Sequence, residues 1–294
     1  MIQTNGFYDL CLQESFFSKE DLQQAVKELY DVGYRTVAVN QVIDDENTEN
    51  KKKQKKKKGE PREIQDIVPI PFDLKIIQDV VTQLDLKNFT VLNRLTVSFA
   101  NQESLHKITK SPNYKKFHII AAAPTTHTAF AFTCGSFEAD IFTFNPENKF
   151  GLRLGRKFYN QLIDRGYHFE LQYSHAIKDS TSRKNLIHAS HLFHSFGKSK
   201  NVFFSSGADC PMYIRSPYDI VNLGFIFGLN ELQCKNAISH CPRKVVVNSV
   251  GRRHGKSVMF VENIDRDTEQ DVMMLENSEE EVEIDQPKHK KTKI

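Results

Sequence analysis

The sequence FYDLCLQES (7–15) alternates apolar and polar side chains, as a half-buried β-strand does. An apolar stripe at helical spacing then runs from Leu22 to Leu29. The β-branched stretch TVAVNQVI (36–43) predicts a second strand. Residues 7–43 are therefore expected to form a β-α-β unit.

The same alternation continues along the chain. Seven strands are expected, over 7–15, 36–43, 90–99, 118–124, 140–145, 169–177 and 201–208. Helices are expected over 74–84, 101–110, 125–134, 155–165, 181–196, 216–227 and 229–239. Strands that alternate with helices favour a parallel sheet, so the expected fold class is α/β, a TIM-like (β/α) barrel of seven to eight parallel strands. The candidates for an eighth strand are KVVVN (244–248) and SVMFVEN (257–263).

Charge is distributed unevenly along the 294 residues. The run KKKQKKKK (51–58) carries +7, residues 262–285 carry −10 and residues 288–294 carry +4, whereas the net charge is +3. The rest of the chain is near neutral, so an anion site on it requires local clustering of cations.

The charged tracts define the expected domain organisation. Residues 44–63 have no apolar period and are expected to be a disordered insertion. One barrel domain is expected over 1–264, followed by a disordered charged tail over 265–294.

The cysteines and the N-terminus indicate a compartment. Five cysteines without a C-x-x-C pair favour free thiols in a reducing environment. The start MIQTNGFYDL lacks the pattern of a signal peptide, and no apolar window approaches the ~18 residues that span a membrane. We expect a soluble intracellular protein with no membrane partner.

One group of basic residues follows the predicted strand 169–177. Asp179 or Ser180 is expected to cap the next helix, whose unpaired N–H groups and dipole favour anions. The cations around this helix start are Lys178, Arg183 and Lys184.

A second basic group follows the predicted strand 201–208. Ser216 is the expected helix cap, Pro217 takes the first helical position and Asp219 completes a capping box. Arg215 precedes the cap. Both groups are expected on the barrel face that holds active sites, where phosphate sites recur.

A third basic group follows the last predicted helix and is punctuated by glycine. Its members are Arg243, Lys244, Arg252, Arg253, His254 and Lys256. Alone it is an ordinary solvated segment, but beside the other two it would extend a path for a polyanion.

A metal-hydrolase interpretation needs His and carboxylate ligands at strand ends. Cys11 and Gln13 stand where an H-x-H pair is needed, and Asn40 and Gln41 offer only neutral amides. The nearby acids are Asp9 and Asp209. His188, His191 and His194 recur on a helix, where a half-exposed face is favoured over a metal site. No catalytic residue and no metal ligand is predicted.

The lysine run has three interpretations: a solvated linker, a nuclear localisation patch or an RNA-contacting arm. Nuclear import is favoured. The residues of this predicted signal are Lys51, Lys52, Lys53, Lys55, Lys56, Lys57 and Lys58.

Several long motifs carry a family resemblance that spans roughly residues 5–255. They are GY (33–34), VAVNQVI (37–43), NRLT (93–96), FELQYSHAIKDSTSRK (169–184), NVFFSSGAD (201–209) and IRSPYDIVNLGFIFGLNE (214–231). In these motifs the chain resembles the thirty-kilodalton protein subunit of nuclear ribonuclease P and RNase MRP. The lysine-rich insertion and the charged C-terminus lie outside the resemblance.

The resemblance implies a barrel related to the polymerase and histidinol phosphatase superfamily, often with fewer than eight strands. It implies a non-catalytic subunit, no cofactor on this chain, and Mg²⁺ on the catalytic RNA that removes 5′ leaders from precursor tRNA. The implied partners are the ribonuclease P and MRP RNAs, a small α/β subunit and other protein subunits, with precursor tRNA contacted indirectly. The implied location is the nucleus and nucleolus.

The sequence is compatible with three functional hypotheses. The first is an RNA-binding scaffold subunit for tRNA and precursor rRNA processing, with Lys178, Arg183, Lys184 and Arg215 as transferable RNA-binding residues. The alternative is a divergent metal-dependent phosphoesterase that would use Asp9 and Asp209. The third is a protein-binding barrel with incidental surface charge.

Overall fold

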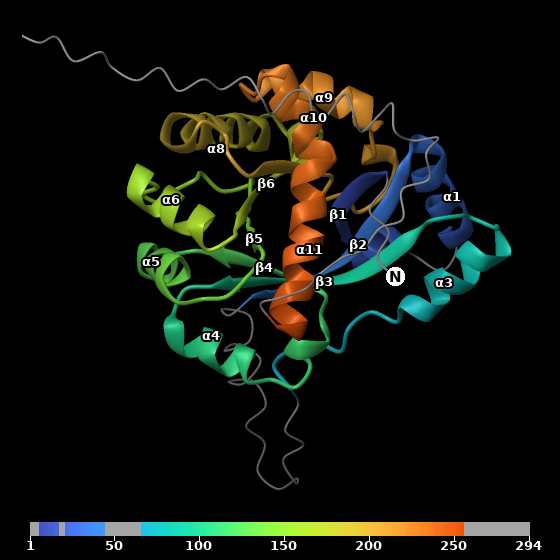
Figure 1. The fold of residues 1–294 in the computed structure, drawn as a ribbon, viewed down its shortest axis with the longest axis horizontal. Helices are drawn as coiled ribbons and strands as arrows, with labels where there is room; N and C mark the ends of the chain where they lie inside the picture. Colours follow the sequence, from blue (N-terminus) through green and yellow to red (C-terminus); the bar gives the residue numbers. More distant parts are fainter. Residues whose placement is uncertain (1–5, 18–20, 45–65, 256–294) are drawn as a thin grey trace, which may run out of the picture. The chain divides into compact units, whose positions relative to one another are not determined.

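The computed structural model describes residues 6–17, 21–44 and 66–255, which belong to one compact unit spanning 1–256. Within these residues, seven parallel strands form one sheet in the order of the sequence (Figure 1). They are β1 (Phe7–Gln13), β2 (Tyr34–Asp44), β3 (Thr90–Phe99), β4 (Ile119–Pro124), β5 (Ile141–Phe142), β6 (His168–Gln172) and β7 (Val202–Ser205).

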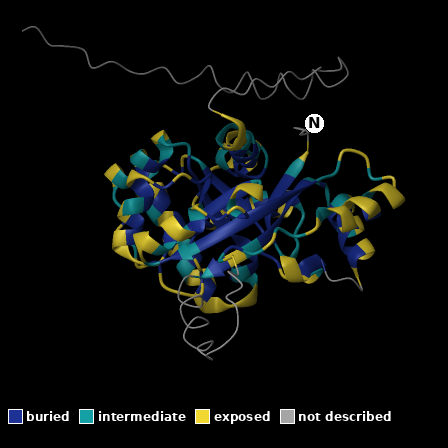
Figure 2. Cartoon of the chain, turned by 90° about the horizontal axis from the view of Figure 1, so that it is seen from below, coloured by how far each residue is buried: buried dark blue, intermediate teal, exposed yellow. Residues whose placement is uncertain are grey.

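Helices surround this sheet, each with buried residues on one side and exposed residues on the other (Figure 2). They are α1 (Leu22–Val32), α3 (Leu74–Gln83), α4 (Gln102–Thr109), α5 (His127–Gly135), α6 (Arg156–Asp164), α7 (Tyr173–Lys178), α8 (Ser180–Gly197), α9 (Pro217–Ile226), α10 (Glu231–Ile238) and α11 (His240–His254). Short 3₁₀ turns are η1 (Glu14–Phe17), η2 (Tyr114–Lys116) and η3 (Pro211–Tyr213). No helix in these described stretches is long and apolar enough to cross a bilayer.

The first β-α-β unit forms as its sequence pattern predicts. Helix α1 buries its apolar stripe from Leu22 to Leu29 and ends at Gly33, which has φ 115°. Glycine adopts this left-handed conformation without a Cβ penalty, so the chain can turn directly into β2.

The sheet curls until its two edge strands meet. Leu12 and Ala208 form a parallel bridge, and the Gln13 amide donates to the Ala208 carbonyl at 2.9 Å. The Gly207 amide donates to the Cys11 carbonyl at 2.8 Å. The predicted TIM-like (β/α) barrel is therefore confirmed, as a nearly closed barrel of seven strands within the described residues.

The prediction of a strand at 244–248 is wrong, because these residues lie within α11. Val245 and Val246 are buried against side chains of the barrel interior, among them Leu10, Ala121 and Phe203. Helix α11 crosses in front of the strands in Figure 1 and covers the amino-terminal mouth of the barrel. The other candidate, 257–263, lies outside the described residues.

Several predicted strands are shorter than expected, including the one over 201–208, which is reduced to β7. The strand over 169–177 ends at Gln172, and α7 begins at Tyr173. The Ser174 amide donates to the Ser206 carbonyl at 2.9 Å, which ties the start of α7 to the segment that follows β7. The strand over 140–145 is reduced to β5, two residues long.

A buried ion pair occupies the barrel interior. Arg94 on β3 and Glu170 on β6 both have side chains with 0 % exposure, and Arg94 Nη2 donates to Glu170 Oε2 at 2.6 Å. A second guanidinium nitrogen, Nη1, donates to the other carboxylate oxygen and to the Leu10 carbonyl. Burial raises the pKa of Glu170, but Arg94 outweighs this effect and the resulting pKa lies below its ordinary value.

Neighbouring polar groups satisfy the remaining hydrogen-bond donors and acceptors of this ion pair. Ser205 Oγ and Gln172 Nε2 donate to the Glu170 carboxylate at 2.7 and 3.0 Å. Arg94 Nε donates to Thr96 Oγ1 at 3.3 Å, and Thr96 Oγ1 donates to Asn40 Oδ1 at 2.6 Å. A charge pair this deeply buried is tolerated only when its remaining donors and acceptors are satisfied.

We expect Arg94→Met to destabilise the protein by about 3–5 kcal/mol, because it leaves the Glu170 carboxylate buried without its partner. Glu170→Leu should have a similar effect. The double variant Arg94→Met/Glu170→Leu should be more stable than either single variant, since no charge is then left uncompensated. Urea unfolding of the four proteins measures this, and additive losses would contradict it.

Candidate functional site

The carboxyl-terminal mouth of the barrel is where a metal hydrolase would hold its ions, and the residues there do not fit a metal. Cys11 is fully buried, and burial raises the pKa of its thiol. Gln13 accepts a hydrogen bond from Asn40 Nδ2 at 3.3 Å, and Gln41 bonds to Glu14 and to the Ile70 carbonyl. A hollow of about 370 Å³ at this mouth is lined by neutral polar side chains, by Val42 and Pro69, and by one acid, Glu14.

The described residues contain no group of three or more His, Cys, Asp and Glu side chains placed to hold a metal ion. Asp209, an acid proposed for the phosphoesterase alternative, is ion-paired with Lys178 at 2.7 Å. His188, His191 and His194 lie on the exposed side of α8. We therefore derive no metal-dependent step for this barrel.

Asp9, the other acid proposed as a ligand, is buried beneath the mouth. Its Oδ1 accepts the Ser206 amide at 3.0 Å and the Cys11 amide at 3.2 Å, whereas Oδ2 has no partner within the described structure. Burial dominates over these hydrogen bonds and raises the pKa of Asp9 to about 6. The protonation state of Asp9 therefore makes the stability of the contact between β1 and the segment after β7 depend on pH.

We expect Asp9 to make the protein less stable as the pH rises from about 4 to about 6. In this window the unfolded chain has lost the proton, with a pKa of 3.8, while the folded chain retains it. A shift of this size corresponds to about 3 kcal/mol, which is lost progressively and stays lost above pH 6. Asp9→Asn cannot titrate, so the difference in unfolding free energy between wild type and variant should change by this amount across the window.

Urea unfolding at several pH values measures that difference, and the other carboxylates cancel because they are common to both proteins. A difference that stays flat between pH 4 and 7 would show that the pKa of Asp9 is ordinary.

The structure brings the first two basic groups together. Lys178, at the end of α7, bonds to Asp209 and places its ammonium 4.4 Å from the centre of the Tyr213 ring. Because Lys178 follows β6 while Asp209 and Tyr213 follow β7, both groups lie at the carboxyl-terminal mouth. The expectation that they share one barrel face is correct.

The start of α8 agrees with its sequence pattern. Asp179 is the helix cap, and its carboxylate accepts the Ser182 amide at 2.8 Å. Arg183 Nε donates to the Ala176 carbonyl at 2.7 Å, and its side chain remains exposed beside that of Lys184. Both cations are accessible to solvent.

The start of α9 differs from the capping box expected for it. Ser216 occupies the cap position and Pro217 the first helical position, but the Ser216 side chain makes no capping bond. Pro217 has no N–H to satisfy, and its fixed φ already suits the first turn. Arg215 turns back and donates from Nη1 to the Met212 and Ile214 carbonyls at 2.9 and 2.8 Å, which leaves its guanidinium half-buried.

The third basic group lies at the other end of the barrel, so it does not extend the path of the first two. Arg252 pairs with Asp140 at 2.9 Å and also donates to the His118 carbonyl at 2.9 Å. Asp140 and His118 precede β5 and β4, which places this end of α11 at the amino-terminal mouth. The remaining members are Arg243, half-buried near the start of α11, and Lys244, Arg253 and His254, which are exposed. Lys256 and the lysines of 51–58 lie outside the described residues.

Arg252→Gln should lower the free energy of unfolding by about 3 kcal/mol, because Asp140 is 3 % exposed and would keep a buried charge without a partner. The neighbouring Arg253→Gln is the matched control. Arg253 is exposed and has no ion pair within the described structure, so its loss should change stability by less than about 0.5 kcal/mol. Equal losses in the two variants would contradict a structural role specific to Arg252.

Sequence reasoning missed the central pair, Arg94 and Glu170. The signal was a single charged residue inside each apolar strand, at TVLNRLTVSF and HFELQ. It also missed Tyr213, whose ring faces Lys178, and a hollow at the amino-terminal mouth lined by Tyr114 and Arg253.

The fold and this site define a class of protein: a (β/α) barrel whose interior is closed by an ion pair and whose exposed cations stand at helix starts around the mouth. The family of RNase P subunit p30 matches residues 6–254, so the chain belongs to that family. It is 29 % identical over 267 residues to the mouse Ribonuclease P protein subunit p30, covering 90 % of this chain and 94 % of that one.

Further comparisons agree. The Ribonuclease P/MRP protein subunit RPP1 of Saccharomyces cerevisiae is 22 % identical over 237 residues, covering 81 % of this chain and 74 % of that one. A chain of a cryo-EM structure of archaeal Ribonuclease P with mature tRNA aligns with a TM-score of 0.58 at 12 % identity, over 87 % of this chain and 98 % of that chain. The structural match supports the barrel fold.

Proposed function

We propose that this chain is a non-catalytic, RNA-binding protein subunit of ribonuclease P and RNase MRP. The observation that carries the proposal is the family match across nearly all of the described barrel, residues 6–254. The site agrees with it, because the mouth offers exposed cations and hydrogen-bonding amides in place of metal ligands. The particle would remove 5′ leaders from precursor tRNA and process precursor rRNA, with Mg²⁺ held by the catalytic RNA and no cofactor on this chain.

The RNA-binding surface we propose is the carboxyl-terminal mouth, with Lys178, Arg183, Lys184 and Arg215. Arg183 and Lys184 would contact phosphates directly, since both side chains are exposed beside the start of α8. The side chain of Lys178 is 26 % exposed, and its charge would neutralise the Asp209 carboxylate toward an approaching phosphate. Arg243, Arg252, Arg253 and Lys256 were also predicted to bind RNA, and Arg252 is the least suited because Asp140 already neutralises it.

The partners and location follow from the same proposal. The ribonuclease P and MRP RNAs would be direct partners, a small α/β subunit and other protein subunits would complete the particle, and precursor tRNA would be contacted indirectly. We place the particle in the nucleus and nucleolus, with the lysine run 51–58 as the import signal.

The test is binding of the full chain to ribonuclease P RNA over a range of salt concentrations. Arg183→Gln and Lys184→Gln should each weaken binding and reduce the slope of log affinity against log salt by about one unit per lost phosphate contact. Lys87→Gln, an exposed lysine ahead of β3, is the control and should leave the slope unchanged.

Lys178→Gln tests whether Lys178 acts by shielding the Asp209 carboxylate or only by contacting a phosphate itself. It should weaken binding more than Lys184→Gln, because it also exposes the Asp209 carboxylate to the phosphates. Lys178→Gln/Asp209→Asn should recover part of the loss. Unchanged slopes in all of these variants would remove the carboxyl-terminal mouth from the RNA surface.

A further inference from the structure

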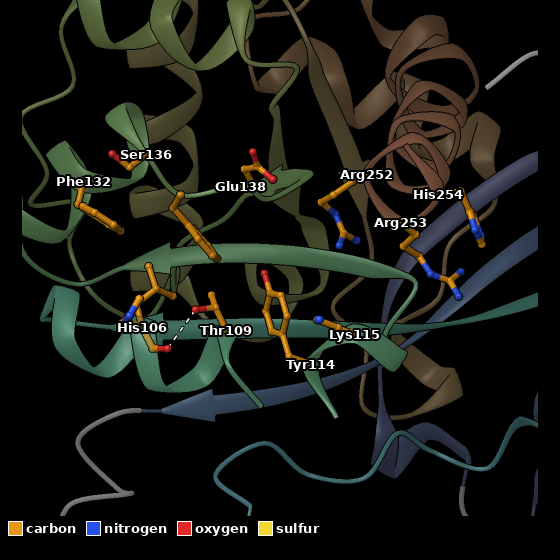
Figure 3. Close-up of a pocket in the computed structure, with 12 residues that line it drawn as sticks. His106, Thr109, Tyr114, Lys115, Phe132, Ser136, Glu138, Arg252, Arg253 and His254 are labelled. Atoms are coloured by element: carbon orange, nitrogen blue, oxygen red, sulfur yellow. Dashed lines mark hydrogen bonds between the residues drawn. The ribbon is translucent and has the colours of Figure 1, made fainter. Parts of the chain in front are cut away.

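A second hollow, of about 760 Å³, lies at the amino-terminal side of the barrel. Three parts of the chain line it: α4 with η2, the end of α5 with the segment before β5, and the end of α11 (Figure 3). Its volume is within the range of small-ligand sites. It shares no residue with the carboxyl-terminal mouth described above.

Basic residues outnumber acidic ones in the lining of this hollow. Lys115, Arg252 and Arg253 line it, against a single lining carboxylate, Glu138. Arg252 is already neutralised by Asp140, but Arg253 has no ion pair within the described structure. Partial burial, with Arg252 as a like-charged neighbour, lowers the pKa of the Arg253 guanidinium. An unpaired and partly desolvated cation of this kind favours an anionic ligand.

Aromatic rings complete the lining. Tyr114 rises from η2 beneath the end of α11, and Phe132 points into the hollow from α5 (Figure 3). Phe137 is held edge-on against Phe99, with ring centres 5.7 Å apart, so its position is fixed by the core. Rings beside cations provide stacking surfaces for a base next to contacts for a phosphate.

We propose that this hollow binds an unpaired nucleotide of an RNA strand, with its base against Tyr114 and Phe132 and its phosphate at Arg253 and Lys115. The choice of RNA as the ligand rests on the proposed function, whereas the site is a separate one. A base within a duplex is paired and stacked on its neighbours and cannot lie against Tyr114 and Phe132, so the ligand is a looped-out or single-stranded nucleotide. The excess of cations over the single lining acid favours a polyanion over an apolar peptide.

The experiment measures binding of the full chain to a short single-stranded oligoribonucleotide and to a blunt RNA duplex with the same number of phosphates. Arg253→Gln and Lys115→Gln should each weaken single-strand binding and lower its salt slope by about one unit. Tyr114→Ala should lower the affinity about 5- to 150-fold, whereas Tyr114→Phe, which keeps the ring, should bind like the wild type. Lys75→Gln, an exposed lysine on α3, is the matched control.

Ultraviolet cross-linking to the same oligoribonucleotide identifies the contact directly. We expect the cross-linked peptide to contain Tyr114 or Phe132 and the cross-link to decrease in Arg253→Gln. Because Arg253 is exposed, this variant remains informative even where Tyr114→Ala fails to fold.

The outcomes distinguish this site from the carboxyl-terminal mouth. Loss of single-strand binding in Arg253→Gln, with Lys184→Gln unaffected in the same assay, supports the hollow as an independent site. Normal single-strand binding and salt slope in Arg253→Gln and Lys115→Gln would overturn the inference, whatever the variants at the carboxyl-terminal mouth show.

Discussion

The Arg94–Glu170 ion pair is the interaction on which the rest of this structure depends. It joins β3 to β6 across the barrel, and both side chains are fully shielded from water. On one side lies the apolar layer that α11 covers, and on the other lie the polar side chains of the mouth, including Asn40, Thr96 and Gln172. Because an unmatched charge at this depth would cost several kcal/mol, the strands must hold the register that keeps the two groups together.

The buried ion pair also determines where on the barrel a ligand can bind. The pair fills the interior, and Cys11 and Gln13 stand at the strand end where a hydrolase needs imidazoles. Ligand contacts are consequently left to the rims, where loops and helix ends project beyond the strands. There, some cations are neutralised by a carboxylate, as Lys178 and Arg252 are, whereas others remain available, as Lys184 does. Local pairing therefore matters more to binding than the net charge of +3.

Most of the fold could be predicted from the sequence, because periodicity reports which side of an element is buried. Local propensity failed where tertiary packing overrides it. The three valines of KVVVN favour a strand, yet Val245 and Val246 pack over the barrel mouth on a helix. The ion pair was beyond a sequence argument for another reason: its partners are 76 residues apart, and only the three-dimensional register of β3 and β6 brings them together.

The third basic group shows that prediction from the sequence has the same limit for the candidate site as for the fold. Sequence order suggested that it continued the first two, but α11 runs across the opposite mouth. At about 3.3 Å per residue, a strand the length of β1 separates the two mouths by about 20 Å, on the order of the width of an RNA helix. One nucleotide therefore cannot contact Lys184 and Arg253 together. If both proposed sites act in one particle, they bind different nucleotides, and the barrel sets the distance between them.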